Sequence, residues 1–149
     1  MSTNTRVVRQ SLRSAVKAGI GYFVAAFGLG FVLGTARVLE VAPAVGVLPA
    51  TLIEVPIMLF ASWHICAWIV RKLSVSSAPR ARLAMGALAF TLLIAAETVL
   101  GVLGFGQTLQ QQIAGYREPG AMLGLVAQLV FALFPLAQVM LTSKRSADQ

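Results

Sequence analysis

The sequence predicts an all-α integral membrane protein, a single domain of four transmembrane helices that occupies residues 1–149. Three numbers support this prediction: 58% of the residues are hydrophobic, only 11% are charged, and the mean hydropathy is +0.82. Soluble domains carry about 25% charged residues, and a soluble fold of this length could not bury so much apolar surface. Disorder is excluded as well, because disordered chains are poor in apolar residues and rich in charge.

Four apolar runs are long enough to cross the hydrocarbon core of a bilayer, which takes about 20 helical residues. They cover residues 18–36, 50–70, 83–106 and 121–141. None of them alternates in the way that a membrane β-strand does, so we expect helices. The first run exceeds the roughly 7–15 apolar residues of a signal-peptide core, and we expect it to be retained.

The basic residues predict the orientation of these helices. Ten of them flank the runs on the side that both termini share: Arg6, Arg9, Arg13, Lys17, Arg71, Lys72, Arg80, Arg82, Lys144 and Arg145. The opposite side holds only Arg37 and Arg117. The positive-inside rule therefore places both termini in the cytoplasm and, for a bacterial protein, the chain in the inner membrane. The net charge of +7 then needs no nucleic-acid partner, and no basic stripe interleaved with aromatic residues indicates one.

The connections on the outer side differ in composition. Residues 41–49 (VAPAVGVLP) are apolar but broken by two prolines and a glycine, which indicates a loop in the interface or between helices. Residues 107–119 are polar, and we expect residues 108–114 to extend the third span as an amphipathic end. Tyr116 would then be an anchor at the membrane interface.

Polar residues within the runs predict a pocket. Counting about 1.5 Å of rise per residue from the middle of each run places Glu97 and Gln128 about 4 Å toward the outer side. The same count places Glu54 at about 9 Å and Arg37 at about 15 Å, with Glu40 further out. All five fall in the outer half of the membrane, and ionisable residues at such depths are costly. We therefore expect a polar pocket that faces outward.

This pocket leads to two functional hypotheses. In the first, Glu54 and Glu97 bind a proton or a cation, since two carboxylates in a low dielectric resist simultaneous ionisation, and Arg37 offsets one of them. The chain would then be a small proton- or cation-linked transporter or channel-like unit. In the second, Glu54 only pairs with Arg37 and Glu97 with Gln128, as contacts that hold helices together. The chain would then be a non-catalytic accessory or assembly subunit of a larger membrane complex.

Two prolines favour the first hypothesis. A proline inside a helix frees the carbonyl four residues earlier, so Pro56 is expected to free that of Leu52 and Pro135 that of Phe131. Broken helices of this kind line the cavities of transporters.

Glycine pairs at four-residue spacing predict close helix packing, either within the bundle or at a homodimer seam. They are Gly30 with Gly34 and Gly120 with Gly124. The expected partners are the lipid bilayer and either further copies of the chain or the subunits of a membrane complex.

Signals for metal, cofactor or catalytic chemistry are missing. His64 is the only histidine and has no ligand-type residue three or four positions away, so we expect no metal site. We expect His64 to form an interhelical hydrogen bond or to line the inner end of a cavity. The sequence has no G-x-S-x-G, H-E-x-x-H, P-loop or C-x-x-C motif, so no cofactor is expected and a non-enzymatic protein is favoured.

Overall fold

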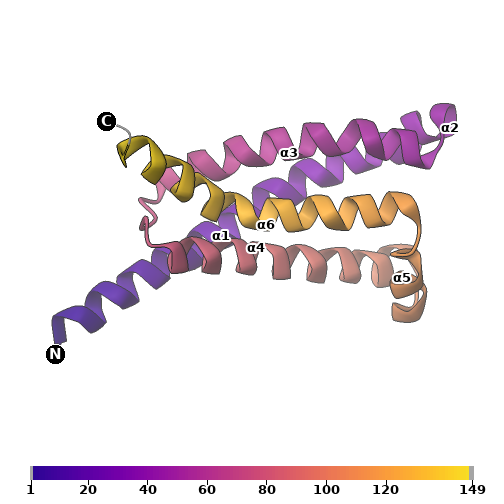
Figure 1. The fold of residues 1–149 in the computed structure, drawn as a ribbon. Coiled ribbons are helices and arrows are strands. Elements are labelled where there is room, and N and C mark those ends of the chain that lie inside the picture. Colours follow the sequence, from indigo (N-terminus) through magenta and orange to yellow (C-terminus); the bar gives the residue numbers. More distant parts are fainter. Residues whose placement is uncertain (1, 148–149) are drawn as a thin grey trace.

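The computed structural model describes residues 2–147, with side chains for residues 11–142, and this part of the chain contains helices and no strand. The elements are α1 (Ser2–Ala36), η1 (Arg37–Val41), α2 (Ala42–Val45), α3 (Val47–Lys72), α4 (Pro79–Val99), η2 (Leu100–Gly104), α5 (Leu109–Gly115) and α6 (Pro119–Ala147) (Figure 1). Four helical segments are long and apolar enough to cross a membrane: Ser11–Val45, Val47–Lys72, Pro79–Gly104 and Pro119–Thr142. The prediction of an all-α chain with four helices able to cross a membrane is confirmed.

The four long helices form a bundle with a ring-like order. Helix α1 packs against α3 and α4, and α6 packs against the same two helices from the other side. Helix α1 begins and α6 ends at one end of the bundle, where the α3–α4 connection also lies (Figure 1). We call this the terminal end, and the end that carries α2 and α5 the distal end. Several of the basic residues counted above (Arg6, Arg9, Lys144 and Arg145) have side chains outside the described range.

The packed core lies toward the terminal end. Two small residues of α1, Ala15 and Ala18, are buried there together with Met85 of α4 and Cys66 of α3. In the same half of the bundle, the rings of Trp63 and Phe134 meet edge to face, with their centroids 5.2 Å apart. Long apolar side chains point outward all along the bundle, as expected for surfaces that face lipid.

Two glycines set the closest helix approaches in this core. A Cβ atom placed on Gly86 would collide with the backbone carbonyl of Ala132, so α4 and α6 touch backbone to backbone. A Cβ atom on Gly19 would lie 2.9 Å from the carbonyl oxygen of Met85, so α1 also approaches the backbone of α4 closely. Small residues at such crossings are what lets membrane helices pack by van der Waals contact.

The α3–α4 connection is held by a buried arginine. Ser74 takes a positive φ of 46°, and Pro79 begins α4. Arg82, only 6% exposed, donates from Nε to the carbonyl of Ser76 (2.9 Å) and from Nη2 to that of Val75 (3.2 Å). The sequence indicated Arg82 only as a flanking charge, whereas its side chain turns inward to satisfy loop carbonyls that would otherwise lack partners.

The distal end departs from the prediction in two places. The expected loop over residues 41–49 is helical except at Gly46, because α1 continues through η1 into α2 and the chain reverses where Gly46 takes a φ of 92°. Helix α5 does not extend the third span, because Gly106 turns the chain with a φ of 64°. Thr108 then starts α5 with a capping box formed with Gln111.

Candidate functional site

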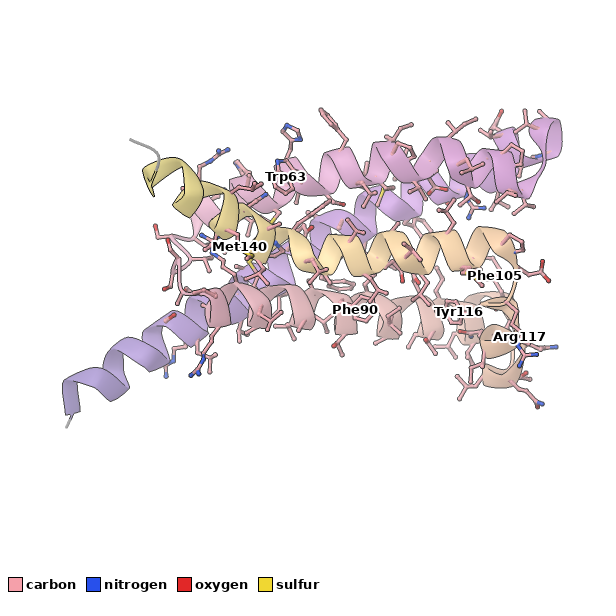
Figure 2. All side chains as sticks on the ribbon, viewed as in Figure 1. Trp63, Phe90, Phe105, Tyr116, Arg117 and Met140 are labelled. Carbon is pink, nitrogen blue, oxygen red and sulfur yellow. The ribbon has the colours of Figure 1, made fainter. Side chains whose placement is uncertain are left out.

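A cavity of about 940 Å³ occupies the distal half of the bundle, between all four long helices. Most of its walls are apolar or aromatic, with Phe27, Phe31, Phe105 and Phe131 among the lining residues. Figure 2 shows the labelled side chains of Phe105, Tyr116 and Arg117 grouped at this end of the molecule, away from Trp63 and Met140. The helices that pack tightly at the terminal end therefore leave a space between them at the other.

Arg37 and Glu54 form an ion pair on one wall of this cavity. The Nε atom of Arg37, on η1, contacts Oε2 of Glu54, on α3. The two side chains are 27% and 17% exposed, so the pair is largely removed from the surface. Gly34, one turn before Arg37, leaves room for this carboxylate, since a Cβ atom there would lie 3.7 Å from Oε1 of Glu54.

Glu97 and Gln128 form a second polar contact, between α4 and α6. Nε2 of Gln128 donates to both carboxylate oxygens of Glu97, at 2.7 Å from Oε1 and 2.8 Å from Oε2. The amide oxygen Oε1 of Gln128 is buried and has no hydrogen-bond partner among the described residues. A buried acceptor without a donor is costly and calls for an explanation at a candidate site.

The two carboxylates are not equivalent. Glu54 faces the guanidinium of Arg37, and this is the single ion pair found among the described side chains. Among the described side chains, the hydrogen-bond partner found for Glu97 is the neutral amide of Gln128. Within the described residues no three His, Cys, Asp or Glu side chains gather as a metal site would require. The cavity lining therefore holds one neutralised carboxylate, one partly buried carboxylate without a cationic partner among the described residues, and the exposed Glu118 just before α6.

Two segments of π-helix border the cavity. Segment η1 carries Arg37, and η2 begins three residues after Glu97. π-Helical turns interrupt regular α-helices and are often found at functional sites. Beyond η2, Nε2 of Gln112 on α5 donates to the carbonyl of Thr98 (3.2 Å), which fastens α5 over the end of α4.

The structure brings together four of the five residues predicted to form the pocket. Arg37, Glu54, Glu97 and Gln128 all line the cavity, whereas Glu40 is exposed on η1 and is not part of the lining.

The four glycines predicted to pack helices also line the cavity: Gly30, Gly34, Gly120 and Gly124. A Cβ atom on Gly30 would lie 3.2 Å from Cε of Met58, and one on Gly120 would lie 3.5 Å from Oγ1 of Thr51. Gly124 faces open space, with nothing within 4 Å of its Cβ position. The closest backbone approaches between helices are instead at Gly19 and Gly86, neither of which has another glycine four residues away.

Tyr116 is a cavity residue that the sequence suggested only as an interfacial anchor. It follows α5, outside the membrane-spanning segments. Partial burial raises the pKa of its phenol above the ordinary value, and the nearby charge of Glu97 raises this pKa further. The phenol is therefore a neutral hydrogen-bonding group at the distal end of the cavity.

His64 takes no part in this site, contrary to the expectation that it bonds to another helix or lines a cavity. Its side chain is exposed on α3, and Nδ1 lies 2.9 Å from the carbonyl of Phe60 one turn earlier in the same helix. The hydrogen bond found for this imidazole therefore lies within its own helix.

Comparisons with protein-family models, curated proteins and solved structures gave no match to this chain. The functional argument therefore rests on the cavity and its polar residues.

Proposed function

We propose that the chain is a small transporter or channel-like unit that binds a proton or a cation at Glu97. The observation that carries this proposal is the difference between the two cavity carboxylates that bond to a neighbouring helix. Arg37 neutralises Glu54, while the partner of Glu97 among the described side chains is the neutral amide of Gln128. An ionisable group inside a membrane is a functional candidate by default, because keeping it there costs about 2.5–3.5 kcal/mol. Glu97 is thus the group available to exchange a proton or to bind a cation.

The orientation belongs to the same proposal. Basic residues concentrate at the terminal end, and the positive-inside rule assigns this end to the cytoplasm of a bacterial inner membrane. The cavity, at the distal end, then faces the periplasm. Substrate would enter from that side, and Glu97 would be the innermost of its acidic groups.

Flux measurements on the reconstituted protein test this function. We expect proteoliposomes to show cation or proton flux driven by a pH gradient, and Glu97→Gln to abolish its pH dependence while the protein still accumulates in the membrane. Glu40→Gln is the matched control, because it makes the same chemical change at an exposed residue outside the cavity lining. Equal flux in wild type and Glu97→Gln would contradict the proposal.

An accessory or assembly role is the second candidate, and one observation favours it. Arg37–Glu54 and Glu97–Gln128 are both contacts between different helices, as expected of polar residues that only stabilise a membrane bundle. Native mass spectrometry of the protein extracted in mild detergent separates the candidates. A homo-oligomer or a retained small ligand supports transport, whereas a stoichiometric complex with foreign subunits supports the accessory role.

A further inference from the structure

We infer that the cavity binds a protonated amine that carries an apolar group about the size of an aromatic ring, with the ammonium group at Glu97. This inference rests on the proposed function and names the class of cation. It follows from three features of the cavity within the described residues. Glu97 is partly buried without a cationic partner, an acceptor without a donor lies beside it, and the mostly apolar walls leave more space than an inorganic ion fills.

The donor set argues against a bare metal cation. Hard cations such as Ca²⁺ take six to eight oxygen ligands, and Mg²⁺ requires an octahedral shell. Of the three acidic side chains in the cavity lining, Glu54 is paired with Arg37 and Glu118 is exposed, which leaves Glu97 as the partly buried one without an ion pair among the described residues. No cluster of three acidic or metal-binding residues occurs in the described part of the chain. A single carboxylate suits a monocation that brings its own hydrogen-bond donors.

An ammonium group matches the acceptors that are present. Both oxygens of Glu97 accept N–H donors, as the contact with Gln128 demonstrates. Oε1 of Gln128 is buried beside them and accepts no hydrogen bond from the described part of the chain. A turn of the Gln128 amide presents this oxygen to a bound ammonium group, which then donates to carboxylate and amide together. A quaternary ammonium ion has no N–H and cannot satisfy either acceptor.

The walls and the volume specify the rest of the ligand. At about 940 Å³ the cavity falls within the range of small-molecule sites, about 300–1,000 Å³. Phe27, Phe31 and Tyr116 contribute aromatic faces to its lining. Aromatic faces attract cations and pack well against apolar rings. The site therefore favours an arylalkylammonium ion over ammonium itself.

The test measures binding of 2-phenylethylammonium to the full chain in nanodiscs of zwitterionic lipid, by isothermal titration calorimetry. We expect one saturable site in the wild type and binding weakened by about tenfold or more in Glu97→Gln, since a charge-assisted hydrogen bond is lost. Glu40→Gln should bind as the wild type does. The trimethylated analogue of the amine should bind more weakly, and 3-phenylpropionate, which has the opposite charge on a similar body, should not bind.

A second pair of variants tests the cavity with Glu97 intact. Gly124→Leu fills the space into which Gly124 opens, and no neighbouring atom lies within 4 Å of its Cβ position to obstruct folding. We expect it to abolish amine binding. Gly28→Leu is the control, because Gly28 is exposed, lies outside the cavity lining and has equally open space at its Cβ position.

Each result separates this inference from the proposed function. Equal uptake of the amine and 3-phenylpropionate would indicate partition into lipid and overturn the inference. Absence of amine binding together with Glu97-dependent, pH-driven flux would overturn the inference and leave the proposed function in place. Absence of both would overturn both.

Discussion

Tyr22 of α1 and Phe131 of α6 connect the two helices that lie diagonally opposite each other in the bundle. Their rings stack with centroids 4.2 Å apart, and the Tyr22 hydroxyl donates to the backbone carbonyl of Phe131 at 3.2 Å. That carbonyl has no helical donor, because the residue four positions later is Pro135. The tyrosine thus supplies the hydrogen bond that the proline removes, at the floor of the cavity that Phe131 lines.

This relationship predicts that Tyr22 and Pro135 are energetically coupled. We expect Tyr22→Phe to lower the free energy of unfolding by about 0.6–1.7 kcal/mol, the range of interhelical hydrogen bonds in membranes. In a Pro135→Ala background the helix provides its own donor to Phe131, so Tyr22→Phe should cost less there. A double-mutant cycle measured by steric trapping in bicelles gives the coupling. Additive effects of the two substitutions would show that the carbonyl does not depend on Tyr22.

Substitution by alanine should lower stability at Gly86, in the α4–α6 crossing, but not at Gly124, which lines the cavity. Gly86→Ala forces α4 away from the Ala132 carbonyl, and we expect a loss of about 1–3 kcal/mol, typical of overpacking. Gly124→Ala enters open space and should be neutral or stabilising by up to about 1 kcal/mol, since alanine has the higher helix propensity. Thermal unfolding in one detergent compares them directly. Equal melting temperatures for the two variants would rule out the close α4–α6 crossing.

The sequence predicted depth along the helices better than direction around them. Because each helical residue adds a fixed rise, counting placed Arg37, Glu54, Glu97 and Gln128 in the same half of the bundle, and all four line the cavity. The same count included Glu40, which is exposed on η1 and lies outside the cavity lining. Rotation about a helix axis depends on tertiary packing, and depth carries no information about it.

The sequence also did not predict the π-helical segments or which glycines make the closest helix contacts. The π-helical segments at Arg37 and after Val99 each widen the turn beyond the α-helical period, and an apolar run gives no periodic signal from which this could be detected. Paired glycines indicate a shared face without saying what that face meets. Gly120 and Gly124 meet the cavity, while the isolated Gly86 makes the tight crossing.

Tyr116 should titrate above the ordinary tyrosine value of about 10. Burial and the charge of Glu97 both raise the pKa of its phenol, so Glu97→Gln should lower this pKa part of the way and leave the larger effect of burial. A raised pKa in the folded state means that stability is lost as pH rises through that pKa. Ultraviolet absorbance of tyrosinate gives the titration, and Tyr116→Phe identifies its contribution beside Tyr22, the other tyrosine of the chain. If the midpoint of the Tyr116 titration were unchanged in Glu97→Gln, the charge of Glu97 would not affect the pKa of this phenol.

The orientation of the bundle decides which compartment the cavity serves. We expect a single cysteine at Gln110, exposed at the distal end, to react with a membrane-impermeant maleimide on intact bacterial cells. A cysteine at Ser77, exposed in the α3–α4 connection, should react only after permeabilisation. Cys66→Ala provides the background and removes a thiol that is fully buried. The opposite labelling pattern would place the basic end outside, against the positive-inside rule. The cavity and Glu97 would then take their ligand from the cytoplasm.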